Sequence, residues 1–219
     1  MTDLWGSFPT WWVKVNKLAT LHATAGEIGT HIAALKIYIL LATKVDYQSK
    51  SVALSYDDLE IGAGLSRPMI KPAVRRLVDI GVLAVANTRP VTYTLIGSET
   101  YPLFAQVPVD LASAALRVLP NRSRSSLAAL KLYITLLFVR DRNTSFARIA
   151  HETLQSYTGV RPDSIKQGID HLVNHKLVHV QPEESTSKPG RPLHVYLIRG
   201  IVNRRDHTSL SSSATSPSA

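Results

Sequence analysis

The chain contains no cysteine among its 219 residues. This absence excludes disulfides, thiolate metal sites and cysteine nucleophiles together. No run approaches the ~20 apolar residues of a membrane-spanning helix, and the segment from Met1 to Trp5 lacks the basic start of a signal peptide. These absences predict a cytoplasmic protein that does not contact a membrane.

Acidic residues are scarce relative to basic ones. The chain has 25 Lys and Arg against 16 Asp and Glu, which gives a formal net charge of +9 and a pI near 9.9. Residues 1–100 carry 10 basic and 8 acidic side chains, whereas residues 101–219 carry 15 and 8, so the surplus lies in the second half. The surplus favours a polyanionic partner, with simple solubility as the alternative.

Motifs of enzymes and of metal sites are also missing. The sequence has no phosphate-binding loop, dinucleotide fingerprint, His-Glu metal helix or nucleophile elbow, so we expect neither catalysis nor a cofactor. His171, His175 and His179 have a spacing that would bring two imidazoles to one ion. No cysteine or suitably spaced carboxylate supports them, so we expect no metal site.

An internal repeat organises the chain. At an offset of 95 residues, Ala33–Ile39 aligns with Ala128–Ile134, and the same ungapped register gives 15 identities in 53 positions. The repeat predicts two copies of one small domain, which we place at residues 1–100 and 101–202 with a junction near Gly97–Pro102. The remaining residues, 203–219, are mostly Ser, Thr, Ala and Pro, which predicts a disordered tail.

Each copy has the same predicted order of elements. A broadly apolar helix comes first, then a short helix, a turn, an amphipathic third helix and a β-hairpin. In the first copy the expected ranges are 32–45, 56–61, 62–65, 67–80, and 82–85 with 91–96. In the second copy they are 127–139, 149–157, 158–160, 162–174, and 177–180 with 193–198. A short strand should precede each copy, at 11–15 and 104–109.

Ser55 is a suitable N-cap for the second helix, with acidic residues in its first turn, and Ser66 can cap the third. Segments Leu54–Leu59, Gly64–Arg67, Ile70–Lys71 and Leu77–Leu83 resemble the winged helix-turn-helix modules of bacterial regulators and of plasmid and phage replication initiators. The segment Ala34–Tyr38 is most similar to the replication-type modules.

This resemblance covers about 170 residues. It implies an α+β, mainly helical chain of two tandem winged helix-turn-helix domains that binds double-stranded DNA, in a bacterial nucleoid or on a plasmid. The use would be transcriptional regulation or initiation of plasmid or mobile-element replication. A winged-helix protein–protein interaction module, of the kind found in chromosome-organisation accessory proteins, is the alternative.

The third helix of each copy supplies the first candidate DNA contacts. With Ile70, Val74, Leu77 and Val78 turned to the core, the outer face of the first copy should carry Arg67, Lys71, Arg75 and Arg76. Pro72 should bend or shorten this helix. In the second copy the candidates are Arg161, Lys166 and Gln167, where Asp163 and Asp170 reduce the attraction to DNA.

The hairpins and one loop supply the others. The longer second hairpin carries Lys188, Gly190 and Arg191, and its Gly-Arg-Pro sequence resembles wings whose arginine enters a minor groove. Arg89 is the equivalent in the shorter first hairpin. Arg122 and Arg124 precede the first helix of the second copy and could hold a backbone phosphate. Ser125 or Ser126 would be the N-cap of that helix. The alternative for all these residues is a solvated surface.

Aromatic residues gather near the start of the chain: Trp5, Phe8, Trp11 and Trp12. They could form a surface for a homodimer or another protein partner, although aromatics at the edge of a small domain more often belong to its core.

Overall fold

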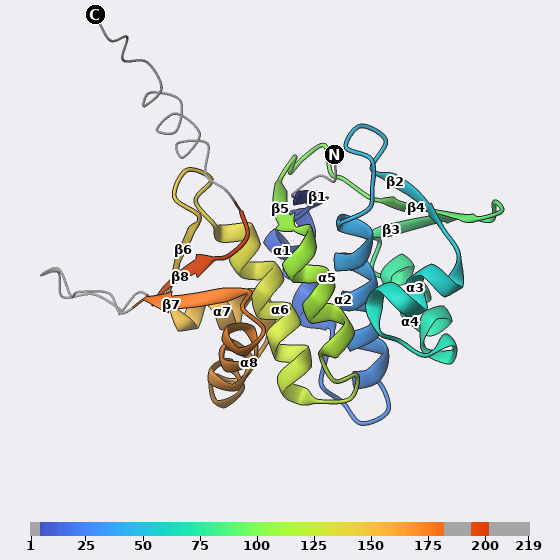
Figure 1. The fold of residues 1–219 in the computed structure, drawn as a ribbon. Coiled ribbons are helices and arrows are strands. Elements are labelled where there is room, and N and C mark those ends of the chain that lie inside the picture. The colour runs from blue at the N-terminus through green and yellow to red at the C-terminus, as the bar shows by residue number, and fades with distance from the viewer. Residues whose placement is uncertain (1–4, 182–193, 202–219) are drawn as a thin grey trace, which may run out of the picture.

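The computed structural model describes residues 5–181 and 194–201. This part of the chain is α+β, about half helical, with three small antiparallel sheets (Figure 1). In the first half the elements are β1 (Trp5–Pro9), α1 (Trp11–Lys14), the 3-10 helix η1 (Lys17–Thr20), α2 (Ile28–Ala42), β2 (Ser51–Leu54), α3 (Tyr56–Ala63), α4 (Arg67–Asp79), β3 (Leu83–Ala86) and β4 (Val91–Leu95). In the second half they are β5 (Phe104–Pro108), α5 (Val109–Val118), α6 (Arg124–Val139), β6 (Phe146–Ile149), α7 (His151–Thr158), α8 (Pro162–Asn174), β7 (Val178–Gln181) and β8 (His194–Ile198).

The internal repeat is present in the structure. The two three-stranded sheets have the equivalent orders β2-β4-β3 and β6-β8-β7. Asp46 and Asp141, which are 95 residues apart, start the same turn: each Oδ1 accepts a backbone amide three residues later, from Ser49 and Thr144, at 2.8 Å. Equivalent residues therefore perform equivalent local tasks in the two copies.

Helices α2 and α6 form the centre of the molecule and pack against each other (Figure 1). Both are apolar around nearly their whole circumference, which is typical of a helix buried on all sides. Helix α4 packs on α2, and α8 packs on α6. Gly168 allows α8 to come close, because a Cβ there would lie 2.6 Å from Cδ1 of Leu132 and 3.1 Å from the backbone nitrogen of Ala129.

Each copy begins with a lead-in segment, β1–η1 in the first copy and β5–α5 in the second, and each lead-in segment packs against the other copy. Strand β1 pairs with β5, and its central pair is Ser7 with Gln106. Helix α5 contacts α2 and α3 of the first copy, whereas α1 and η1 contact α7 of the second. The glycine that ends each short helix is covered in this way: Gly64 lies against Arg117, and its equivalent Gly159 lies against Ala19. The two copies therefore pack against each other and are not joined only by a flexible linker.

The expected strand at 11–15 is wrong, because Trp11–Lys14 is a helix and the strand lies earlier, at Trp5–Pro9. A continuous apolar run fits a strand or a buried helix equally well, and here packing decides. The indole nitrogen of Trp12 donates to the hydroxyl of Tyr38 at 3.0 Å and to the carbonyl of Pro9 at 3.1 Å, in a fully buried setting. The expected strand at 104–109 is confirmed as β5.

Other boundaries also differ from the expectations. Helices α2 and α6 begin at Ile28 and Arg124, earlier than expected, because their first turns, residues 28–31 and 124–126, are largely polar and lie ahead of the apolar run that marked each helix. The short strands β2 and β6 were not expected, and Ile149 ends β6 instead of starting a helix. Helix α5 was not expected either. The predicted tail at 203–219 lies outside the described residues.

Candidate nucleic-acid interface

Helix α4 is built as an amphipathic helix. Ser66 is its N-cap residue by backbone conformation but makes no side-chain cap bond, and Pro72 lies inside it. Its buried face consists of Ile70, Ala73, Val74 and Leu77, which pack toward α2. The expectation that Val78 is part of this face is wrong: Val78 is 43% exposed, and Ala73 completes the face instead.

Two of the four basic residues expected on the outer face are exposed and free of an ion pair among the described residues. These are Lys71 and Arg75, which are one helical turn apart. Arg67 is also exposed, but its Nη1 lies 2.6 Å from Oδ1 of Asp57 on α3. That carboxylate offsets part of the charge which Arg67 would offer to a polyanion.

Arg76 does not belong to the free outer face, which corrects the expectation. Its side chain is half-buried, and its Nη2 donates to the backbone carbonyl of Thr20 at 3.0 Å. The Nε atom is buried and has no hydrogen-bond partner among the described residues. Arg76 therefore attaches α4 to the end of η1.

Helix α8 has the bounds that the sequence predicted, Pro162–Asn174. Lys166 and Gln167 are exposed on its outer side, together with Asp170. Arg161 occupies the N-cap position, and its Nη2 forms an ion pair with Oδ2 of Asp163 at 2.9 Å. The outer face of α8 is thus closer to neutral than that of α4.

The loop before α6 carries Arg122 and Arg124, both exposed, and Arg124 is the first residue of the helix. The expected cap at Ser125 or Ser126 is wrong. The N-cap residue is Ser123, and Ser126 is fully buried. Arg124 therefore lies at the helix start itself rather than ahead of it.

The hairpin β3–β4 projects from the body at the right of Figure 1, and Arg89 is exposed in its turn. The turn that carries Arg89 is held in place by its two flanking strands, because both belong to a three-stranded sheet. Lys188, Gly190 and Arg191 in the second hairpin lie outside the described residues.

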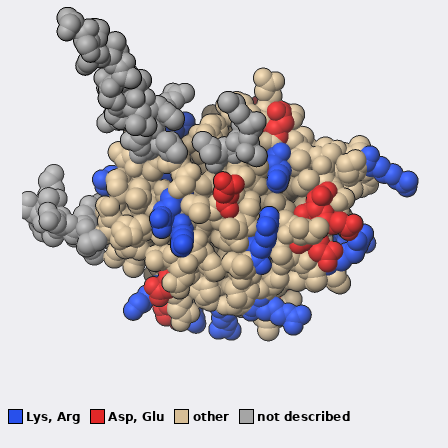
Figure 2. Space-filling view, in the orientation of Figure 1, with Lys and Arg blue, Asp and Glu red and all other residues tan. Residues whose placement is uncertain are grey.

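The two candidate helices lie in the lower half of the view in Figure 1, whereas the hairpin β3–β4 projects above them at the right. Helix α8 lies at the lower left, α4 at the right, and the N-terminal ends of α2 and α6 lie between them. Figure 2 shows Lys and Arg side chains following this lower edge, with an acidic group at its left end and a larger acidic cluster at the right. Basic side chains therefore extend along the edge between the two helices.

The N-terminal aromatic residues divide between core and surface. Phe8 and Trp12 are buried, and Trp11 is half-buried with its indole nitrogen donating to the carbonyl of Ile96 at 2.8 Å. Trp5 is 42% exposed. Most of this cluster serves packing within the chain.

The histidines do not gather into a metal site in the described ranges, where no group of three or more His, Cys, Asp or Glu is placed to hold an ion. His171 and His175 lie 6.3 Å apart between ring centroids. A second pair, which the sequence did not suggest, is closer: the rings of His151 and His194 stack at 3.8 Å, beside the hydroxyl of Tyr196. Burial, and then the charge of His194, lower the pKa of His151.

No protein-family model matches the chain, and no curated protein matches it either. Among the described residues, no helix is long and apolar enough to cross a membrane.

Proposed function

We propose that the chain is a tandem winged-helix protein that binds double-stranded DNA. Each copy has a central helix, a short strand, a helix-turn-helix pair and a β-hairpin that completes a three-stranded sheet. In this interpretation α4 and α8 are the helices that enter the major groove, and the hairpins are the wings. The protein is then a transcriptional regulator or an initiator of replication on a plasmid or mobile element.

The observation that carries the proposal is the outer face of α4. Lys71 and Arg75 are exposed, adjacent on the helix and free of acidic partners within the described ranges, while the opposite face of α4 is buried against α2. An isolated basic face on a rigid helix can contact base edges and phosphates without first breaking an ion pair. The net charge of +9 supplies long-range attraction to the same partner.

A salt titration tests the proposal. Fluorescence anisotropy with a random duplex should show affinity that falls steeply with salt, because each neutralised phosphate releases counterions. The double variant Lys71→Ala/Arg75→Ala should weaken binding to every sequence and reduce the salt slope by up to about 2.

The matched control is Lys44→Ala/Arg142→Ala. These exposed residues follow the C-terminal ends of α2 and α6, at the end of the molecule opposite the basic edge. The control should change affinity little. If both double variants bind like the unmodified protein, or if no duplex is bound at all, α4 is a solvated or protein-binding face. If the protein binds duplex as expected, selection of the bound sequences would separate promoter sites from origin repeats.

A further inference from the structure

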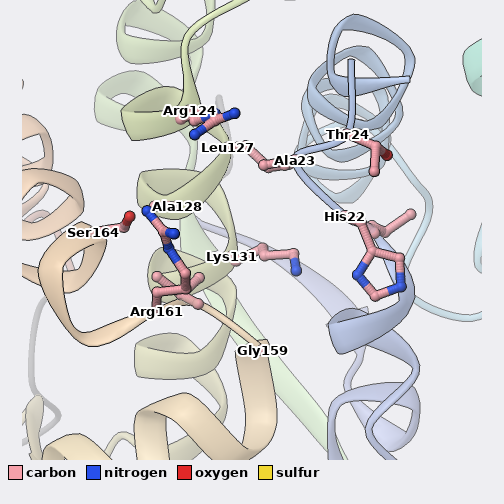
Figure 3. A pocket seen from close by; sticks show the side chains of 12 residues that line it. His22, Ala23, Thr24, Arg124, Leu127, Ala128, Lys131, Gly159, Arg161 and Ser164 are labelled. Atoms are coloured by element: carbon pink, nitrogen blue, oxygen red, sulfur yellow. The ribbon is translucent and has the colours of Figure 1, made fainter. Parts of the chain in front are cut away.

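A pocket lies where the first copy meets the second (Figure 3). Its volume is about 310 Å³. One wall is the segment after η1, which includes His22 and Thr24, and the other walls come from α6 and from the turn into α8. Both copies are therefore needed to form it.

Among the residues that the structure describes, the pocket is lined by three cationic side chains and by no carboxylate. Arg124, Lys131 and Arg161 contribute the cations, and Figure 3 shows them around one open space. Acidic groups reach the lining only indirectly: Asp163 pairs with Arg161 at 2.9 Å, and Glu27 accepts a hydrogen bond from Thr24. Three positive charges against these two neighbouring carboxylates leave an excess of positive charge at the pocket.

Lys131 is the most constrained of the three cations. It is only 3% exposed, and its Nζ donates to the carbonyl of Thr158 at 2.6 Å, where α7 ends. This bond uses one of its three N–H donors, and no other partner is present among the described residues. Burial lowers the pKa of Lys131 to about 8, so an anion beside it would relieve the cost of keeping it charged.

The two arginines stand at helix starts, where a positive charge is unfavourable. Arg124 is the first residue of α6, and Arg161 is the N-cap residue of α8. Neither helix has a side-chain cap, and the positive end of each helix dipole adds to the charge of its arginine. A bound anion would turn both unfavourable placements into favourable ones.

We infer that this pocket binds a phosphate group. Arginine forks match the paired oxygens of a phosphate, and both Arg124 and Arg161 line the pocket. The phosphate can belong to the backbone of bound DNA or to a free phosphate ester. Only the first source rests on the proposed function, and the pocket's position between the copies fits a strand that passes from one to the other.

Inorganic phosphate is the probe for the pocket itself. At constant ionic strength and pH 7, 10 mM phosphate replacing chloride should raise the melting temperature of the full chain. Arg124→Ala should lose this rise, whereas Lys44→Ala should keep it, because Lys44 is exposed but does not line the pocket. Arg124→Lys, which keeps the charge but not the fork, should show a reduced rise.

A second experiment identifies the source of the phosphate group. If DNA supplies the phosphate, Arg124→Ala should weaken duplex binding at least 5-fold more than Lys44→Ala, and inorganic phosphate should compete with the duplex. If phosphate raises the melting temperature in a way that needs Arg124, but inorganic phosphate does not compete with the duplex, the pocket is assigned to a free phosphate ester. The same rise in a protein that binds no duplex overturns the proposed function alone. Equal behaviour of the Arg124 and Lys44 variants in both experiments overturns the assignment of a phosphate site to this pocket.

Discussion

The side-chain amide of Asn121 donates a hydrogen bond to the carbonyl oxygen of Gly64 at 2.9 Å. Gly64 ends α3 in the first copy with φ +61, and Asn121 belongs to the loop before α6 in the second. The bond satisfies a carbonyl that the helix end leaves open. The turn between α3 and α4 is therefore held from outside its own copy.

Gly64→Ala should lower the free energy of unfolding by about 2–4 kcal/mol, because an L-residue is strained at positive φ and the added Cβ would meet packed backbone. That Cβ would lie 2.7 Å from the carbonyl oxygen of Arg117. Urea denaturation measures the loss. Gly97→Ala is the control, since nothing lies within 4 Å of its added Cβ, and it should stay within about 0.5 kcal/mol. Equal effects would mean that the turn is not held as described.

Arg75 and Arg76 should separate binding from stability. Arg76→Ala removes a charged hydrogen bond to the carbonyl of Thr20 and the packing of a half-buried side chain, so we expect a loss of about 1 kcal/mol of stability. Arg75→Ala should leave stability within about 0.5 kcal/mol and reduce the salt slope of duplex binding by about 1. Denaturation and anisotropy on both variants check this. A larger stability loss for Arg75→Ala than for Arg76→Ala would contradict the roles assigned to them.

These contacts show what the sequence can and cannot reveal. Helices α4 and α8 were predictable because their apolar residues recur at spacings of three and four on one face. Arg76 has the same local pattern as a free outer residue, but its partner Thr20 is 56 positions away, and no periodicity reports such a contact. The pocket could not be predicted from the sequence for the same reason, since its walls come from both copies.

The N-terminal error had a different cause. Trp11–Val13 is a short apolar run that fits a strand or a buried helix, and the buried packing of Trp12 against Tyr38 and Pro9 is a long-range feature that the run itself does not report. The sequence does carry a signal for the strands β2 and β6: Asp46 and Asp141 are identical at the repeat offset and mark the turns that lead into them.

The stacked pair His151–His194 predicts a loss of stability in mild acid. The pKa of His151 is lowered on folding, so between that lowered value and about 6.5 the unfolded chain binds more protons than the folded one. Stability is therefore present above pH 6.5 and falls as the pH drops below it. The lowered pKa values of His31 and His175, also caused mainly by burial, act in the same direction.

His151→Gln should accordingly show a smaller loss than the unmodified protein when urea denaturation is compared at pH 7.5 and pH 5.5. His179→Gln, an exposed position on β7, is the control and should lose as much as the unmodified protein. A steeper acid dependence in His151→Gln would show that the stacked pair does not oppose protonation.

Arg191 stays a predicted contact of the second wing. Arg191→Ala should weaken binding to a selected site by about 1–3 kcal/mol, the loss expected for one well-placed DNA contact. The loss should be larger when the flanking position is A·T-rich, because a narrow minor groove is more negative. Anisotropy with two duplexes that differ only in that flank measures it. Equal losses on both flanks would make Arg191 a phosphate contact, and no loss would remove the wing from the interface.

The spacing of DNA subsites should be fixed by the contacts that cross between the copies. Strand β1 pairs with β5, α2 packs on α6, and each lead-in segment packs against the other copy. The distance between α4 and α8 is therefore fixed, unlike that between two domains joined by a flexible linker. Two helices held on one side of a duplex favour subsites ~10 bp apart. Inserting 5 bp between selected subsites should reduce affinity to that of a single copy, because the second subsite rotates to the far side.

Inserting 10 bp separates the rigid arrangement from a flexible one. The insertion restores the rotational phase but adds a full turn of distance, which a flexible tether tolerates at some cost in effective concentration. Because the lead-in segments tie the copies together, we expect affinity to stay at the single-copy level. Anisotropy on the three duplexes, with a footprint to locate the protected bases, provides the measurement. Recovery with the 10 bp insertion would mean that β1–β5 and α2–α6 separate when the protein binds DNA.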